Sequence, residues 1–263
     1  MRKSSKKILL GLILFTCGLI LVLHFFPIKV FKDSSRQNLF EKALQYLLCS
    51  VAAICLVLYL DIKLFSKPTR WLTLIPCLII AIDNFPFISY FNGNMEIVKK
   101  EAIEIFLFVC YCFGVGIFEE CVFRGIVFSV FAERLPNDKK GFLLTYLLSS
   151  VCFGFAHLFN LFSGAGIIPT LLQVGYTTLT GGLFAFALIQ TKNLLCCGFL
   201  HGIYNFCGLL LSEQGLGNGI VFDMGTTVMM AIVSVLVGIY VLYSLFRYPE
   251  EERKILYQKL SID

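Results

Sequence analysis

Charged residues are scarce in this chain. Asp, Glu, Lys and Arg make up 15% of the 263 residues, whereas 58% are hydrophobic. Soluble domains are about 45–50% apolar and about 25% charged. The shortage of charge therefore excludes an ordinary soluble domain and predicts a membrane protein with several spans. The 22 Lys and Arg are dispersed between apolar segments. The net charge of +5 therefore does not form the basic patch that is typical of nucleic-acid binding.

Several sequence motifs are also missing. No C-x-x-C pair occurs among the 11 cysteines, which excludes a zinc ribbon and a thioredoxin-like site. The cysteines lie within hydrophobic segments, and we interpret them as buried free thiols. Neither G-x-G-x-x-G nor a Walker A loop is present, so no nucleotide is expected as a partner. H-E-x-x-H, the helical motif of many zinc proteases, is absent as well.

Long apolar segments dominate what remains. A bilayer core requires about 20 apolar residues per helix, and eight segments approach that length: 8–26, 43–60, 71–91, 102–131, 142–160, 166–190, 194–211 and 225–246. We therefore predict an all-α, polytopic membrane protein of about eight helices. The first segment is interpreted as a retained helix, because no signal-peptide cleavage pattern follows it. Segment 71–91 is the weakest, since Pro76, Asp83 and Pro86 predict a bent or partly re-entrant helix.

The distribution of basic residues predicts the orientation. With eight spans, 15 Lys and Arg lie between spans on one side of the membrane and 6 on the other. The positive-inside rule then predicts that both termini are cytoplasmic, and the plasma membrane is the expected location. The segment 27–42 carries four basic residues on the predicted outer side, and it opposes this orientation.

Three charges interrupt one of the most apolar stretches. Between Phe106 and Phe131 the only charged residues are Glu119, Glu120 and Arg124. A charge at the bilayer centre costs about 2.5–3.5 kcal/mol even on lenient insertion scales, so three in one span indicate function. Glu120 and Arg124 share a helix face at i and i+4, in the favoured order, and are predicted to form an ion pair. Glu119 points elsewhere and remains available for chemistry.

His157 is the predicted partner of Glu119. The two residues are symmetric about Asp138, in a segment from 135 to 141 whose Pro, Asn, Asp and Gly predict a turn. If the flanking helices form an antiparallel hairpin, Glu119 and His157 lie at the same depth. His201 and Asn205 form another polar pair at i and i+4. By itself this second pair could simply join helices by hydrogen bonds.

These residues permit two kinds of hydrolytic site. A carboxylate facing an imidazole can activate water by general base catalysis, with His201 and Asn205 donating hydrogen bonds to a developing oxyanion. Alternatively, Glu119, His157 and His201 could bind zinc with a water in the open position. The residues alone leave both possibilities open.

At this point the sequence resembles a known family. Glu119-Glu120-x-x-x-Arg124, Phe153-x-x-x-His157 and His201-x-x-x-Asn205, in this order, are similar to the signature of the CAAX protease and bacteriocin-processing (CPBP, or Abi) family of intramembrane endopeptidases. The resemblance covers about residues 101–211. It divides the chain into N-terminal helices (1–100), a catalytic core (101–211), and a last span with a short tail (212–263).

The resemblance implies a membrane protease whose substrate is a membrane-associated protein or peptide precursor. It implies that Glu119 and His157 activate the water, that His201 and Asn205 stabilise the oxyanion, and that Glu120 and Arg124 support the site. Family members are often classed as metalloproteases; we favour a mechanism without metal, and zinc remains possible. No feature of the sequence selects a prenylated substrate over another peptide.

Two other classes of function are compatible with an intramembrane polar cluster. One is a non-catalytic scaffold, such as an immunity protein or a regulator of a sensor kinase. Such a protein does not require ionisable groups in the bilayer, where burial is costly, and this chain has five: Glu119, Glu120, Arg124, His157 and His201. The other is a proton-coupled transporter, which predicts inverted repeats that the sequence does not show.

Overall fold

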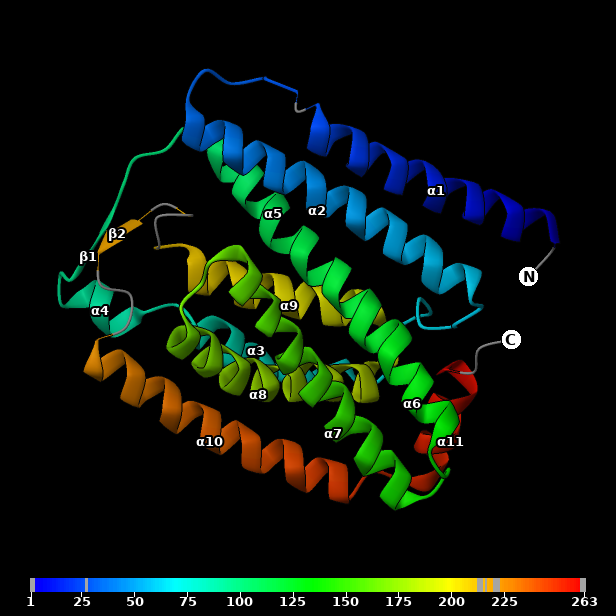
Figure 1. Cartoon of the computed structure of the whole chain (residues 1–263). Helices are drawn as coiled ribbons and strands as arrows, with labels where there is room; N and C mark the ends of the chain where they lie inside the picture. The colour runs from blue at the N-terminus through cyan, green and yellow to red at the C-terminus, as the bar shows by residue number, and fades with distance from the viewer. Residues whose placement is uncertain (1–2, 27, 212–214, 216, 220–222, 261–263) are drawn as a thin grey trace.

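The structure is a computed structural model that describes residues 3–26, 28–211, 215, 217–219 and 223–260 (Figure 1). Helices make up most of this part of the chain. In chain order the elements are α1 (Lys3–Phe25), α2 (Ser34–Tyr59), η1 (Trp71–Leu74), α3 (Ile75–Asp83), α4 (Phe87–Phe91), β1 (Met95–Ile97), α5 (Ala102–Glu120), η2 (Cys121–Val127), α6 (Phe128–Arg134), α7 (Lys139–Ala156), η3 (His157–Ser163), α8 (Ile167–Thr191), α9 (Leu194–Leu209), β2 (Gly217–Gly219), α10 (Met224–Phe246) and α11 (Glu250–Leu260).

The helices confirm the prediction of a polytopic all-α membrane protein. Six helical spans in the described part of the chain are long and apolar enough to cross a bilayer: Lys6–Leu23, Ser34–Tyr59, Ala102–Arg134, Lys139–Ser163, Ile167–Thr191 and Met224–Phe246. Two shorter apolar helices, Trp71–Asp83 and Leu194–Leu209, account for the other two predicted segments. The only strands described are β1 and β2, which pair antiparallel with Met95 opposite Gly219.

Two elements differ in extent from the predicted segments. α2 begins at Ser34 rather than at residue 43, because the Asp33 side chain accepts a hydrogen bond from the Arg36 backbone N–H and caps the helix. Polar residues of the predicted loop 27–42 therefore form the first turns of a helix. The segment 71–91 is divided between η1, α3 and α4, with the break at residues 84–86 beside Pro86.

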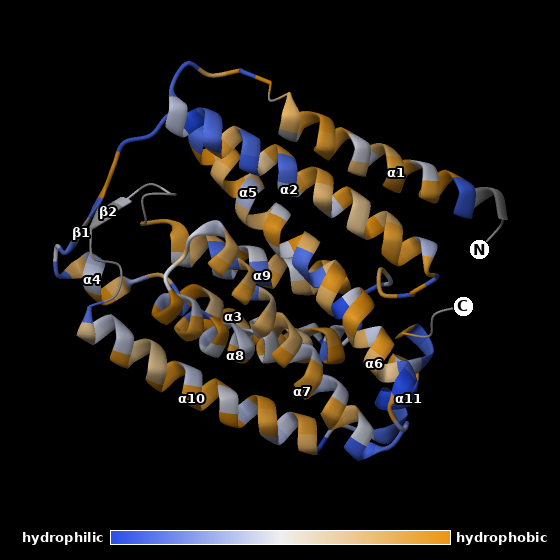
Figure 2. Ribbon diagram, viewed as in Figure 1, coloured by the Kyte–Doolittle hydropathy of each residue, from blue (hydrophilic) through white to orange (hydrophobic). Residues whose placement is uncertain are grey.

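α8 is the central helix of the bundle. From Leu183 to Thr191 every residue is buried, as expected for a helix that is packed on all sides. α1 and α10 lie at the periphery and are mainly hydrophobic (Figure 2), and their apolar side chains are largely exposed. In a bilayer these outward faces contact lipid. The hydrophilic colour in Figure 2 is concentrated at α11 and in other segments at the ends of the bundle.

The loop 60–70 connects both ends of the described chain to one end of the bundle. Lys6, near the start of α1, forms an ion pair with Asp61 at 2.7 Å. At the other end of the chain, the backbone N–H of Lys63 donates to the carbonyl of Lys259 in α11. The first turns of α1 and the helix α11 therefore lie on the same side (Figure 1).

Candidate active site

The site begins where α5 changes its helical geometry. α5 ends at Glu120, and the chain continues as the π-helix η2, which contains Arg124. π-helical turns are rare and occur frequently at functional sites. Two hydroxyls accompany this turn: Ser129 donates to the carbonyl of Gly125 at 2.6 Å, and Ser149 of α7 donates to the carbonyl of Phe123 at 3.3 Å. The change in geometry thus occurs at the three predicted charges.

Glycines allow α5 to approach α9 closely. A Cβ on Gly116 would lie 2.6 Å from the carbonyl oxygen of Gly198 and 2.7 Å from the backbone nitrogen of Gly202. Any larger residue at 116 would separate the two helices. Close approach through small residues is a common way for helices to associate in membranes. Here it brings the last turn of α5 against the part of α9 that carries His201.

Glu120 lies at the centre of the polar cluster. Its side chain is fully buried. One carboxylate oxygen, Oε1, is 2.9 Å from His201 Nδ1, and the other, Oε2, is 3.1 Å from Arg124 Nε. The predicted Glu120–Arg124 pair is therefore present. Glu120 also has a second partner, His201. Because His201 lies on another helix, the spacing of residues within one helix could not predict this contact.

Arg124 connects this cluster to α8. Its guanidinium is fully buried, and Nη2 donates to the carbonyl of Gly181 at 2.6 Å. The guanidinium carbon lies 4.5 Å from the centre of the Phe153 ring, within the range of a cation–π contact. Arg124 thus bridges η2, α7 and α8, and its charge is balanced by Glu120.

His201 is held in a defined orientation. Its ring stacks on Phe184 with 4.3 Å between centroids and an angle of 17°. Because Glu120 accepts a hydrogen bond from Nδ1, the Nε2 atom is directed at the second glutamate, 3.7 Å from Glu119 Oε2. A histidine whose Nδ1–H is held by a carboxylate has a fixed tautomer and ring position.

Glu119 is the carboxylate that reaches the surface of the cluster. Its side chain is 22% exposed, whereas that of Glu120 is 0% exposed. It interacts electrostatically with both His201 and His157. The predicted division between the two glutamates therefore corresponds to a real difference in burial and in partners.

His157 occupies the first position of η3, directly after α7. The break between α6 and α7 falls at 135–138, within the predicted turn, and the Asp138 side chain caps α7. His157 Nδ1 is 3.1 Å from the carbonyl oxygen of Phe153, and the imidazole is half-buried. The ring of Phe153 makes edge contacts with both His157 and His201. The histidine within 4 Å of Glu119 is thus His201, and His157 interacts with Glu119 electrostatically and contacts the edge of Phe153.

Asn205 lies one turn beyond His201 on α9 and is half-buried. No hydrogen bond joins its amide to another of the residues that the structure describes. Its position permits it to act beside His201, and its role stays a prediction. A neighbouring amide is engaged: Asn84 Nδ2 donates to the carbonyl of Tyr204 at 2.8 Å and joins the end of α3 to α9.

The zinc alternative can be compared with this geometry. Among the described residues, no three His, Cys, Asp or Glu side chains lie close enough together to hold a metal ion. Glu119, His157 and His201, the predicted ligand set, are all described. Since they do not converge in this conformation, we assign no step of the reaction to a metal.

The comparisons with known proteins point to the same segment. Residues 101–207 match the family model described as "Type II CAAX prenyl endopeptidase Rce1-like". The chain is also similar to "CAAX prenyl protease 2" of Saccharomyces cerevisiae, with 27% identity over 127 residues, which cover 44% of this chain and 40% of the relative. No solved structure matches the chain.

The fold and the site define a class of protein: a polytopic helical membrane protein with a buried glutamate–histidine cluster. The match over residues 101–207 supports a relationship to the CAAX protease family. The matched region spans about 40% of the length of the curated relative.

Some contacts of the cluster were missing from the sequence prediction. Phe184, which stacks on His201, was not singled out, and its residue type does not distinguish it from an ordinary packing position. Phe153 was part of the predicted motif, but its contact with Arg124 was not predicted. The pairing of Glu120 with His201 was also missed. A usable signal existed for it, because Gly198 and Gly202 form a G-x-x-x-G spacing around His201.

Proposed function

We propose that this protein is an intramembrane endopeptidase that hydrolyses a peptide bond in a membrane-associated protein or peptide. The single observation that carries the proposal is the placement of Glu119. It is a partly exposed carboxylate, 3.7 Å from an imidazole whose other nitrogen is held by a buried carboxylate. This arrangement provides a base at the edge of an otherwise closed polar cluster, inside a segment that matches a protease family.

In the proposed mechanism, Glu119 is the general base. Its carboxylate removes a proton from a water molecule as the water oxygen attacks the scissile carbonyl carbon. The proton on Glu119 is then transferred to the nitrogen of the leaving amine when the C–N bond breaks. His157, which interacts electrostatically with Glu119, helps to position the water. Protein dipoles that are fixed before the reaction stabilise such charge changes effectively in a site of low dielectric.

His201 and Asn205 are proposed to stabilise the developing oxyanion. Both are on the same face of α9, and the Asn205 amide is not hydrogen-bonded to another described residue, so its N–H groups are available. The hydrogen bond from its Nδ1 to Glu120 fixes the His201 ring, so that Nε2 is directed toward Glu119.

We also propose the substrate class and the orientation. The name of the yeast relative refers to prenylated CAAX proteins, so a prenylated CAAX peptide is the first substrate to test. The excess of basic residues at the end of the bundle that contains α11 supports a cytoplasmic location for this end.

The test compares three full-length proteins in membranes: wild type, Glu119→Gln, and Asp83→Asn as a matched control. Asp83 is a half-buried carboxyl in an apolar helix outside the cluster. Cleavage of a fluorogenic prenylated CAAX peptide and the N-terminal fragments of membrane proteins are measured. We expect cleavage products with wild type and Asp83→Asn, and their loss with Glu119→Gln at equal protein level. Undiminished products with Glu119→Gln would contradict the proposal.

The scaffold alternative makes the opposite prediction. If a deletion phenotype is restored fully by Glu119→Gln, the protein acts through binding rather than hydrolysis.

A further inference from the structure

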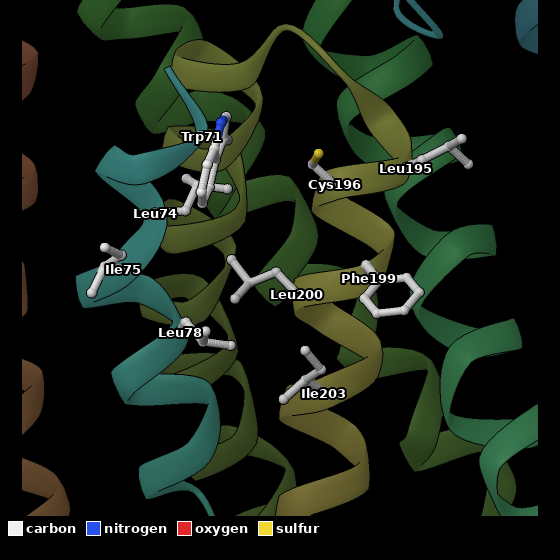
Figure 3. A pocket seen from close by; sticks show the side chains of 9 residues that line it. All are labelled: Trp71, Leu74, Ile75, Leu78, Leu195, Cys196, Phe199, Leu200 and Ile203. Atoms are coloured by element: carbon white, nitrogen blue, oxygen red, sulfur yellow. The ribbon is translucent and has the colours of Figure 1, made fainter. Parts of the chain in front are cut away.

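An apolar groove of about 400 Å³ lies between η1–α3 and α9, on the side of α9 away from Glu120. Its two walls have helical spacing, with Trp71, Leu74, Ile75 and Leu78 on one side and Leu195, Cys196, Phe199, Leu200 and Ile203 on the other (Figure 3). Trp71 to Leu78 spans about 10 Å along the helix axis. The groove thus has the length and the lining that suit part of a lipid acyl chain.

A hydrogen bond between the two walls marks one end of the groove, and Trp71 marks the other. Beyond Leu78 and Ile203, the hydrogen bond from Asn84 to the carbonyl of Tyr204 joins α3 to α9. At the opposite end, Trp71, Leu195 and Cys196 form the mouth, where Trp71 is 59% exposed. Tryptophan is enriched at the level of lipid headgroups, so an acyl chain entering here would leave its headgroup at this end.

The loop that leads to Trp71 carries basic residues. The loop 60–70 is tied against the turn between α8 and α9, because the backbone N–H of Thr69 donates to the carbonyl of Thr191 and Asn193 Nδ2 donates to the carbonyl of Ser66. This loop holds Lys67 and Arg70 next to Trp71. Both side chains are exposed. The nearby Lys192 forms an ion pair with Glu252, which also interacts with Arg70. One carboxylate thus faces two cations, and an excess of positive charge remains at the loop.

Lys67 and Arg70 differ in how firmly they are held. The Arg70 guanidinium lies over the Tyr248 ring at 5.7 Å, while Lys67 has no charged partner among the residues that the structure describes. Pockets between membrane helices with basic residues at the headgroup level are suited to anionic lipids. We propose that this groove binds an anionic phospholipid, with one acyl chain between α3 and α9 and the phosphate at Lys67 and Arg70.

Such a lipid would support the helix that carries His201. The groove is lined by Phe199, Leu200 and Ile203, which alternate on α9 with the buried His201. An occupied groove therefore restrains α9 from the side opposite Glu120. This site is separate from the catalytic cluster, and the inference holds whether or not the protein is a protease.

The chain contains a single tryptophan, Trp71, which provides a direct measurement. The full-length protein is reconstituted into vesicles in which either phosphatidylglycerol or phosphatidylcholine carries brominated acyl chains, and quenching of Trp71 fluorescence is compared. We expect the brominated phosphatidylglycerol to compete at least fivefold better for the groove. The double variant Lys67→Gln, Arg70→Gln should abolish this preference, since each cation near the headgroups contributes about 1 kcal/mol, or roughly fivefold.

Two further variants are compared: one is a control for the removal of charge, and the other tests binding in the groove. Lys29→Gln, Lys32→Gln removes the same charge from the exposed loop at the far end of α2 and should leave the preference unchanged. Leu78→Phe narrows the groove and should weaken quenching by both lipids. Equal quenching by the two lipids in wild type would indicate ordinary boundary lipid and overturn the proposal. Quenching that falls for both lipids as the protein density rises would indicate that a second copy covers the groove, and would also overturn it.

Discussion

His201 contacts both members of the glutamate pair, with Nδ1 2.9 Å from Glu120 Oε1 and Nε2 3.7 Å from Glu119 Oε2. Two adjacent carboxylates therefore have different relationships to one imidazole. The buried Glu120 fixes the ring, whereas Glu119 is partly exposed.

This difference predicts opposite effects of the two Glu→Gln substitutions. Glu119→Gln should reduce the rate of cleavage by at least two orders of magnitude, the range of a general base, with little change in thermal stability because the side chain is partly exposed. Activity and the unfolding midpoint in detergent are measured together. A variant that loses activity only in proportion to its folded fraction would indicate a structural role for Glu119.

Glu120→Gln should instead reduce stability, because it leaves the buried Arg124 charge without a counterion. Removing one partner of a buried ion pair costs about 3–5 kcal/mol. Thermal unfolding of Glu120→Gln and of the double variant Glu120→Gln, Arg124→Met tests this. We expect the double variant to recover part of the lost stability, since no unpaired charge remains in it. An unchanged unfolding midpoint in Glu120→Gln would contradict the assignment.

Gly116→Ala should separate α5 from α9. The added methyl meets the backbone of Gly198 and Gly202 at distances under 3 Å, and overpacking of this kind costs about 1–3 kcal/mol. The expected result is a lower unfolding midpoint together with reduced activity, because His201 is displaced from the glutamates. Gly238→Ala in α10 is the matched control, since nothing lies within 4 Å of the added atom. Equal behaviour of the two variants would show that the close crossing is not required.

The contact between α11 and the rest of the protein should weaken in acid. The hydrogen bond from the buried Lys192 ammonium lowers the pKa of Glu252. Because the pKa of Glu252 is lower in the folded protein, the contact stabilises the folded state fully above the pKa of the unfolded chain, about 4.3. This stabilisation disappears as the pH falls through the pKa of Glu252 in the folded protein.

Glu252→Gln tests this contact. Because Glu252 is 32% exposed, the effect at pH 7 should be only about 1–2 kcal/mol, less than for a fully buried pair. The difference from wild type should shrink near pH 3. The exposed neighbour Glu251 provides the control Glu251→Gln, which should unfold as wild type does. A difference that persists unchanged at pH 3 would contradict the electrostatic explanation.

Chelation tests the choice between the two hydrolytic mechanisms. Since no three potential ligands converge among the described residues, we expect peptidase activity to persist after incubation with EDTA or 1,10-phenanthroline and removal of the chelator. Loss of activity that added zinc restores would support the alternative in which Glu119, His157 and His201 bind a metal.

The order of apolar segments was accessible from the sequence because burial in lipid requires long hydrophobic helices, and their lengths are set by the bilayer. The Glu120–Arg124 pair was accessible because both residues lie on one helix, where spacing fixes geometry. The turn between α6 and α7 was accessible because its residues favour turns.

Relationships between separate helices were not accessible in this way. The sequence singled out Glu119, Glu120, Arg124, His157, His201 and Asn205 as expensive groups in an apolar environment. Only the tertiary structure decided that His201 rather than His157 contacts both glutamates, because this depends on how closely α5 crosses α9. That distance is set by the contact of Gly116 with Gly198 and Gly202. The periodicity of one helix does not specify its depth or its rotation relative to another helix.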